Sequence, residues 1–439
     1  MKSKQDLTVG NINKKLWAFA IPLMLGNVMQ QFYNLVDTWV VGKYIGDNAL
    51  AAVGSSYSLM TFLTSVILGL CLGSSAFFSI TFGEKNIKRL KNGMFISFVM
   101  IGIFSLILTF VSFYLCGRIM KILQVPYDIQ GIMSEYLRWI FVGIFATFLY
   151  NYFSNLLRGI GNSIIPLVFL CISVILNISL DLYFVLKQGI RGAAIATVIS
   201  QYISGIGLMI YVYIRYPELR LKYEDTKFVK RTAYDIAILS GMTCLQQSVM
   251  NFGILMVQGI VNSFGTQIMA AFAVSVKIDT IAYMPVQDFG NAFSTFIAQN
   301  FGAGKYDRIK DGIKKALKSV VMFCIFISAI VFIFAKPLMM IFVNAESTEI
   351  INIGVQYLRI EGVCYIGIGI LFMLYGYYRA INKPSMSVVL TVISLGIRVV
   401  LAYVLSRVIG VVGIWWSIPI GWFIADAVGI CFYLFKFDR

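Results

Sequence analysis

The sequence predicts an all-α integral membrane protein in which twelve transmembrane helices form two parallel repeats of six. Three observations point to this class. Hydrophobic residues make up 59% of the 439-residue chain and charged residues 13%, whereas soluble proteins have roughly 45–50% and about 25%. Apolar runs long enough to cross about 30 Å of hydrocarbon recur along the whole chain. The second half of the chain also repeats the first half in register.

The first six spans are apolar runs separated by short polar loops. The first follows a polar leader, carries Asp37 and lacks a cleavage site of small residues, so we expect a retained helix and not a signal peptide. The second contains Gly69 and Gly73, a spacing that lets another helix approach closely. The six spans are 16–41, 51–82, 94–115, 139–157, 164–186 and 192–214.

The last six spans follow a polar segment and are joined by loops that are just as short. No loop is long enough to form a soluble catalytic domain. We expect an N-lobe at 1–214 with helices 1–6, a cytoplasmic linker at 215–232 and a C-lobe at 233–439 with helices 7–12. The six spans are 236–261, 270–301, 319–335, 362–378, 385–406 and 408–435.

The distribution of basic residues predicts the orientation of the helices. Of the 36 lysines and arginines, 25 lie in the N-terminal segment, the even-numbered loops and the C-terminus. Ten lie on the opposite side of the membrane, and Arg398 lies within a span. By the positive-inside rule, both termini are expected to be cytoplasmic. The net charge of +16 therefore reports topology, and its densest runs are expected to face anionic lipid. Nucleic acid is not expected as a partner, because no recognised binding module accompanies these runs.

The composition excludes several kinds of catalytic and metal site. The chain has no histidine, which removes histidine-liganded metals and nucleophiles activated by histidine. The seven cysteines are scattered through apolar runs, as small hydrophobic residues would be. Gly302-Ala303-Gly304-Lys305 resembles the end of a phosphate-binding loop, but Gln299 and Tyr306 stand where that loop needs glycine and serine or threonine. We therefore expect neither an enzyme nor a cofactor.

The two halves align over most of their length. Because six is an even number, both halves enter the membrane in the same direction. Parallel repeats of this kind are typical of secondary transporters, in which the halves expose a site to alternate sides. A duplicated channel or receptor remains an alternative. At an offset of 219 the matches include Gly46 with Gly265, Phe82-Gly83 with Phe301-Gly302 and Arg89 with Arg308, and at 221 they include Tyr136-Leu137-Arg138 with Tyr357-Leu358-Arg359 and Arg158 with Arg379.

A few charges lie well inside the predicted spans. Placing such a charge at the centre of a membrane helix costs about 2.5–3.5 kcal/mol of insertion free energy. A functional role is therefore the first interpretation of each. For one of them, Asp426, a structural role inside the bundle is an equally good interpretation. The charges are Asp37, Asp181, Asp288, Arg398 and Asp426.

The first half contains a cluster of candidate ion-binding residues. Asp37 and Asp181 are expected at similar depth in the outer half of the bilayer. Asn177 precedes Asp181 by four residues and shares its helix face, and Thr197 adds an oxygen from the next helix. Two desolvated carboxylates repel each other, which favours proton uptake, and the same oxygens suit Na⁺. The alternative is a set of hydrogen-bonded packing groups.

A second set of polar residues is expected to line a substrate cavity. Asp288 and Arg398 lie at equal depth, which suggests an ion pair, because an unpaired buried charge is costly. Asp279 is expected to line a wet vestibule, and Glu361 is expected at an interfacial helix end. The expected cavity residues are Gln30, Asn34, Gln247, Asn251, Asp288 and Arg398.

Nearly the whole chain resembles the multidrug and toxic compound extrusion (MATE) transporters of bacteria. The fragments are modest singly and specific together, because they occur in order and in both halves. They are Ile21-Pro22, Asp37-Thr38 with Val41-Gly42, Ala51-Ala52-Val53-Gly54, Asn155 to Asn162, and Asn291 to Gly304.

The resemblance implies a V-shaped pair of lobes that export amphipathic, often cationic, drugs or metabolites in exchange for H⁺ or Na⁺. It also implies a multi-pass protein of the cell membrane whose partners are such small substrates and the lipid bilayer, and we expect a monomer. Members with an acidic residue on helix seven use it in a C-lobe cation site, whereas this chain has Gln246 and Gln247 near that position. We therefore expect coupling in the N-lobe, with Na⁺ as a possible ligand and no other metal. The N-lobe site residues that the resemblance implies are Asp37, Asn177, Asp181, Thr197 and Asn155.

A flippase for lipid-linked carriers, from the same superfamily, is the main alternative. Such a protein would need several basic residues facing a central cavity. Arg398 is the one basic residue that the sequence places clearly inside the membrane.

Overall fold

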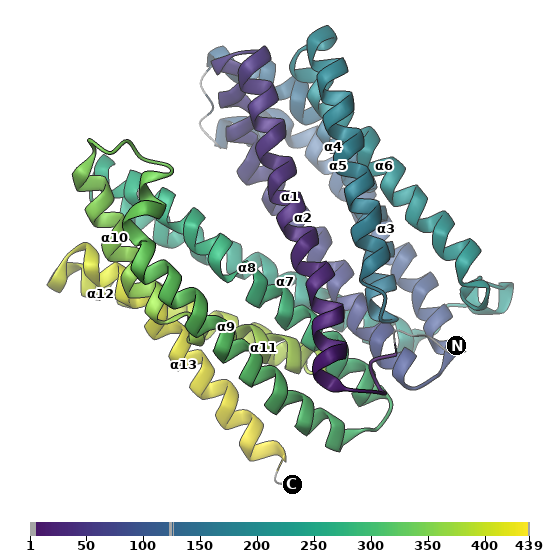
Figure 1. Cartoon of the computed structure of the whole chain (residues 1–439). Coiled ribbons are helices and arrows are strands. Elements are labelled where there is room, and N and C mark those ends of the chain that lie inside the picture. The colour runs from purple at the N-terminus through teal and green to yellow at the C-terminus, as the bar shows by residue number, and fades with distance from the viewer. Residues whose placement is uncertain (1–5, 123–124, 126, 438–439) are drawn as a thin grey trace. The chain divides into compact units, whose positions relative to one another are not determined.

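The computed structural model describes residues 6–122, 125 and 127–437, and this described part is built from helices and short connections (Figure 1). The α-helices are α1 (Ile12–Tyr44), α2 (Asp47–Gly83), α3 (Ile87–Ile122), α4 (Tyr127–Gly159), α5 (Ile164–Gln188), α6 (Ile190–Arg215), α7 (Lys230–Asn262), α8 (Thr266–Gly302), α9 (Tyr306–Met340), α10 (Thr348–Val363), α11 (Tyr365–Ala380), α12 (Pro384–Ile409) and α13 (Val411–Phe437). Two 3₁₀ turns, η1 (Pro217–Leu219) and η2 (Tyr223–Thr226), lie in the segment between α6 and α7.

The predicted all-α membrane class is confirmed, with a difference at the tenth span. Among the described residues, ten helices are long and apolar enough to cross a membrane, and the bent pair α10 and α11 makes an eleventh. The remaining long helix is α1, whose apolar residues are interrupted by a stripe of polar ones, Asn27, Gln30, Asn34 and Asp37.

The tenth span is longer than predicted and is broken. α10 and α11 meet at Cys364 with a bend of 53°, and the predicted span at 362–378 covers only the second of them. α10 escaped the hydropathy criterion because Glu349, Arg359 and Glu361 interrupt its apolar residues. At the break, the amide of Cys364 donates to the carbonyl of Glu361 at 2.8 Å, which tightens the last turn of α10.

Packing divides the chain into two compact units. Unit 1 is built from Ile21–Cys244, and unit 2 from Leu7–Ala20 together with residues 245–437. Each unit therefore contains the beginning of a long helix whose remainder belongs to the other unit. α1 begins in unit 2, and α7 begins in unit 1.

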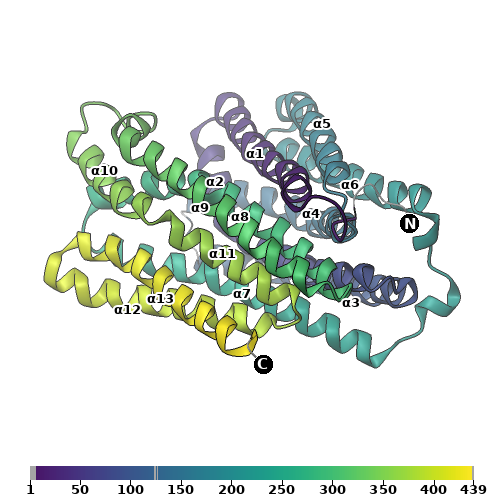
Figure 2. The same ribbon diagram turned by 60° about the horizontal axis from the view of Figure 1, so that its bottom comes forward.

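The same helix packings recur in both units, as a duplication requires. In unit 1, α2 packs on α4, α4 on α6, and α5 on α6. In unit 2, the corresponding contacts join α8 with α11, α11 with α13, and α12 with α13 (Figures 1 and 2). The helices in corresponding pairs are related by the sequence repeat, when α10 and α11 are taken as one span.

Two glycines of α2 bring the first part of α7 into close contact in unit 1. A Cβ atom added to Gly73 would lie 2.3 Å from the carbonyl oxygen of Leu239, and one added to Gly69 would lie 2.6 Å from Cα of Cys244. Any side chain at these positions would therefore force the two backbones apart. Beside them, the hydroxyls of Ser74 and Ser240 are hydrogen-bonded at 2.8 Å. The close-packing role predicted for Gly69 and Gly73 is confirmed.

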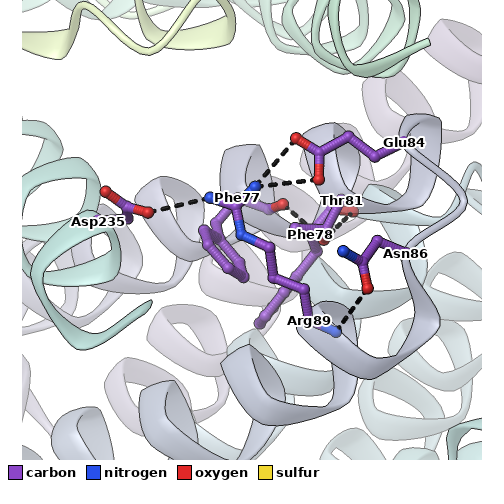
Figure 3. Close-up of polar contacts among 7 residues, drawn as sticks. All are labelled: Phe77, Phe78, Thr81, Glu84, Asn86, Arg89 and Asp235. Atoms are coloured by element: carbon purple, nitrogen blue, oxygen red, sulfur yellow. Dashed lines mark hydrogen bonds and ion pairs between the residues drawn. The ribbon is translucent and has the colours of Figure 1, made fainter. Parts of the chain in front are cut away.

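A charged network also holds the beginning of α7 in unit 1. Nη1 of Arg89 donates to both carboxylate oxygens of Glu84, each at 3.0 Å. Nη2 donates to Oδ2 of Asp235 in the first turns of α7, also at 3.0 Å (Figure 3). The guanidinium carbon lies 5.2 Å from the centroid of the Phe77 ring. Arg89 thus links the turn after α2 with the start of α7.

Unit 2 repeats this arrangement with a backbone group in place of the carboxylate. Nε and Nη2 of Arg308 donate to the carbonyl of Leu7 at 3.3 and 3.1 Å, and the guanidinium lies 5.6 Å from the Phe296 ring centroid. Arg308 corresponds to Arg89 and Phe296 to Phe77 in the repeat. Each unit therefore uses an arginine over a phenylalanine ring to hold the chain at the start of an exchanged helix.

The segment between α6 and α7 is fixed to α3. Lys91 forms an ion pair with Asp225 of η2. Nδ2 of Asn92 donates to the backbone carbonyls of Asp225 and Lys227 at 3.0 and 2.7 Å. The connection between the halves is therefore an ordered part of unit 1.

Candidate functional site

Three neighbouring helices of unit 1 bring together the polar residues predicted to bind the coupling ion. Asp37 lies on α1, Asn177 and Asp181 lie on α5, and Thr197 lies on α6; all four are buried. Asn177 and Asp181 share a face because they are four residues apart on one helix. Nδ2 of Asn177 donates to Oγ1 of Thr197 at 3.3 Å, which joins α5 to α6 at this site.

The two carboxyl groups of the site face each other. The carboxyl groups of Asp37 and Asp181 lie close enough together to act on each other's charge. Neither oxygen of Asp181 accepts a hydrogen bond from another described residue. An ionised carboxylate has no proton to donate, so contact between two such groups requires a shared proton or a small cation between them. Two carboxyl groups placed in this way are therefore suited to sharing one positive charge.

Two tyrosines complete this cluster, and the sequence reasoning missed both. The hydroxyl of Tyr33 on α1 is 3.1 Å from Oγ1 of Thr197. Tyr136 on α4 is buried close to both carboxyl groups. Tyr33 precedes Asp37 by four residues, and this spacing was the signal that could have identified it. Tyr136 carried no such signal, because its helix approaches the site only through tertiary packing.

Asn155 does not lie with this cluster. It is four residues from the end of α4, whereas Asp181 is 17 residues from the start of α5. A short turn connects these two ends, so at about 1.5 Å per residue the depths are about 6 and about 26 Å. The site that the resemblance implied is therefore assembled without Asn155.

The two candidate cavity residues of α1 lie beside the cluster. Asn34 is half-buried and Gln30 is exposed on the same helix as Asp37. The carbonyl of Asn34 accepts a hydrogen bond from the hydroxyl of Thr38 at 2.7 Å. Neither side chain is drawn into the Asp37 and Asp181 contact.

Unit 2 contains a cavity of about 250 Å³ that lies entirely within that unit. Asn251 and Arg398, both predicted to face a substrate cavity, are among its lining residues. Gln247 and Asp288 are not among the described residues that line it; Gln247 is half-buried on α7 and Asp288 is buried on α8. The Asp288–Arg398 ion pair therefore stays a prediction.

Two carboxyl groups that were predicted to lie in contact with water, those of Asp279 and Glu361, line this cavity. Glu361 of α10 is 1% exposed, so its expected interfacial position was wrong. Asp279 of α8 is 4% exposed and lines this cavity, and its place in a wet vestibule stays a prediction. Glu361 looked interfacial because the predicted span began at residue 362. In the structure α10 and α11 together are long and apolar enough to form one bent span, and Glu361 lies inside this pair of helices.

The charged groups of this cavity are set among aromatic rings. The guanidinium of Arg398 lies 5.8 Å from the centroid of the Trp422 ring. Tyr283 and Tyr357 also line the cavity. The break between α10 and α11 at Cys364 comes three residues after Glu361. Broken helices are common where membrane transporters bind ions and substrates. The cavity therefore combines two acids and one base with an aromatic wall.

Comparisons with known proteins agree with this architecture. The MatE family model matches residues 22–183 and 240–404, one match in each half of the chain. Probable multidrug resistance protein YpnP of Bacillus subtilis is 28% identical over 396 residues, which cover 89% of this chain and 87% of that protein. Probable multidrug resistance protein NorM of Thermotoga maritima is 25% identical over 427 residues, which cover 93% of this chain and 89% of that protein.

A solved structure has the same fold along nearly the whole chain. It is a transporter of the MOP superfamily from Pyrococcus furiosus, with a TM-score of 0.92 at 22% identity, covering 98% of this chain and 97% of that one. The family model accounts for well over half of the residues and matches both repeats. The chain therefore belongs to the MatE family, the multidrug and toxic compound extrusion transporters.

Proposed function

We propose that this chain is a secondary antiporter that exports amphipathic, cationic drugs or metabolites in exchange for H⁺ or Na⁺. The observation that carries this proposal is the pair of buried carboxyl groups, Asp37 and Asp181, facing each other in unit 1. Their neighbours Tyr33, Asn177 and Thr197 are neutral. A charge on the pair is therefore balanced by the coupling ion and not by a fixed basic residue.

Coupling follows from competition for the same negative charge. When H⁺ or Na⁺ binds between Asp37 and Asp181, the site loses the charge that holds a cationic substrate. Substrate release is then favoured on the side from which the ion enters, which we propose to be the outside. Linkage requires the reciprocal effect, so bound substrate lowers the affinity for the coupling ion in that same state.

We propose the cavity of unit 2 as a second contact for the substrate, in addition to the Asp37 and Asp181 pair. Aromatic faces attract cations, and the carboxyl groups of Asp279 and Glu361 supply negative charge. Arg398 limits the net charge of this cavity to about one negative unit when both acids are ionised. A monovalent cation with aromatic rings matches this combination.

A flippase for lipid-linked phosphates has less support. Such a ligand needs several positive groups, and the cavity of unit 2 is lined by Arg398 beside two acids among the residues described. Relatives of this chain are named as multidrug resistance proteins. We therefore keep the export of cations as the proposed activity.

Transport by the purified protein in liposomes tests this proposal. A proton gradient and a Na⁺ gradient are imposed separately, and the movement of a fluorescent organic cation is recorded. We expect one of the two gradients, at least, to drive accumulation against the concentration gradient of the dye. Dye movement that is insensitive to both gradients would contradict ion coupling.

A further inference from the structure

Polar side chains continue from the Asp37 and Asp181 cluster into the remainder of unit 1. Thr197 accepts a hydrogen bond from Asn177, and Gln201 follows Thr197 by four residues on α6. Side chains at this spacing are neighbours on a helix surface. Oε1 of Gln201 accepts a hydrogen bond from Oγ1 of Thr147 on α4 at 2.8 Å. Polar side chains thus follow one another from α5 through α6 to α4.

Close packing at one glycine allows this contact between α4 and α6. A Cβ atom added to Gly143 would lie 2.9 Å from Cγ2 of Val198 and 3.7 Å from Oε1 of Gln201. A side chain at Gly143 would therefore push α6 away and separate Gln201 from Thr147.

On α4 the polar side chains follow one another at intervals of four residues. Nδ2 of Asn151 donates to the carbonyl of Thr147 at 2.8 Å, and Nδ2 of Asn155 donates to the carbonyl of Asn151 at 2.9 Å. These bonds use the amide nitrogens and leave the amide oxygens available as acceptors. Oδ1 of Asn155 is buried and accepts no hydrogen bond from a described residue.

The line reaches α2 near the end of α4. Oγ of Ser75 donates to the carbonyl of Asn155 at 2.9 Å, and Oγ of Ser79 donates to the carbonyl of Ser75 at 2.8 Å. By the distribution of basic residues, this end of unit 1 is the one expected to be cytoplasmic. We name this line the polar file; it consists of Thr197, Gln201, Thr147, Asn151, Asn155 and Ser75.

The chemistry of the polar file suits a small cation in transit. Its hydroxyl and amide oxygens are neutral, so they solvate a cation without holding it as tightly as a carboxylate does. Conduction requires such a series of weak sites. Buried oxygens without a protein donor, such as Oδ1 of Asn155 and Oδ1 of Asn177, are also places where water or a cation would be stabilised.

Arg158 stands at the exit of the polar file. It follows Asn155 by three residues, and its Nε is buried without a hydrogen-bond partner among the described residues. Its positive charge disfavours a cation resting beside Asn155. A cation that reaches Asn155 is therefore expected to be released at this end and not held there.

We propose that the polar file is the route by which the coupling cation leaves Asp37 and Asp181 through the interior of unit 1, as Na⁺ or as a proton carried by bridging water. This proposal rests on the proposed antiport function and adds to it an exit path, with Thr147, Gln201 and Asn155 as positioning residues. The substrate does not share this path, because a row of single side chains has no room for an organic cation.

The test compares two modes of transport in liposomes. Gradient-driven uptake of a fluorescent cation requires release of the coupling ion in every cycle, whereas exchange of labelled for unlabelled substrate without a gradient does not. We expect Thr147→Val and Asn155→Leu to lower gradient-driven transport by about tenfold, equal to about 1.4 kcal/mol in barrier height. Exchange should stay close to that of the wild type, and Thr147→Ser should recover most of the loss.

A matched control and two contrary outcomes make the test decisive. Thr109→Val removes a hydroxyl that donates to the carbonyl of Ser105 at 2.9 Å on α3, away from the polar file, and should leave both modes unchanged. Wild-type gradient-driven transport in Thr147→Val and Asn155→Leu would overturn the polar file and leave the antiport function standing. Equal loss of both modes would assign these residues a structural role. A wild-type protein without gradient-driven transport would overturn the proposed function, and the polar file with it.

Discussion

The hydroxyl groups of Tyr33 and Thr197 lie 3.1 Å apart and join α1 to α6 one turn from Asp37. Thr197 also accepts a hydrogen bond from Asn177. The helix that carries the first carboxyl group is thereby attached to the helices that carry its neutral neighbours.

Removing the Tyr33 hydroxyl tests the importance of this contact. In Tyr33→Phe, one hydrogen bond of about 1 kcal/mol is lost, so we expect the half-saturating concentration of the coupling ion to rise by about fivefold. The measurement is gradient-driven dye uptake at a series of ion concentrations. Tyr57→Phe on α2, where the ring is exposed, serves as the control. An unchanged ion dependence in Tyr33→Phe would exclude the hydroxyl from the site.

The Arg89 and Asp235 ion pair is expected to stabilise the attachment of α7 in unit 1. The pair is partly exposed, so its coupling free energy should be about 0.5–1 kcal/mol and should fall as salt is added. A double-mutant cycle of Arg89→Ala and Asp235→Ala, read from thermal unfolding in detergent, measures it. Additive effects of the two substitutions would show that the pair contributes nothing.

The Asp225 carboxylate predicts a pH dependence in the segment between the halves. Partial burial opposes ionisation, but hydrogen bonds from Lys91 and from the amide of Lys222 and the positive charges of both lysines lower the pKa of Asp225 below its ordinary value. Because the folded-state pKa is lowered, this stabilisation is complete above the unfolded value of about 3.9 and is lost as the pH falls through the lowered pKa. The Tm difference between the wild type and Asp225→Asn should therefore shrink below about pH 4. A difference that grows on acidification would contradict this assignment.

Arg398 is expected to limit the affinity of the unit 2 cavity for cations. In Arg398→Gln, a positive charge beside Asp279 and Glu361 is removed, so a fluorescent organic cation should bind about tenfold more tightly. Equilibrium dialysis of the purified protein measures this affinity. Arg407→Gln, an exposed position near the end of α12, removes the same charge elsewhere and should have little effect. Weaker binding in Arg398→Gln would mean that the arginine itself contacts the ligand.

Much of the fold was predictable because a helix that crosses the hydrocarbon core must be about 20 mostly apolar residues long. Apolar length located most spans, and the offset between Arg89 and Arg308 revealed the duplication. The exchange of the first parts of α1 and α7 between the units had no such signal. It depends on contacts such as Gly73 against Leu239, which join residues far apart in the chain.

The candidate site was predictable where local spacing carried the information. Asp37, Asn177 and Asp181 were identified by their cost in the membrane and by helical spacing. Glu361 was misplaced because the predicted span began at residue 362, one residue after it. Asn155 shares a motif with the family but lies at another depth, and a motif alone does not specify depth.

The loss of gradient-driven transport in two single variants tests the central claim most directly. Asp37→Asn and Asp181→Asn each remove one of the facing carboxyl groups, and Asp307→Asn removes an exposed carboxylate at the start of α9 as a control. Uptake of a fluorescent organic cation is measured in liposomes under a proton gradient and under a Na⁺ gradient. We expect both site variants to lose gradient-driven uptake while Asp307→Asn retains it. Uptake like that of the wild type in both Asp37→Asn and Asp181→Asn would contradict coupling at this site.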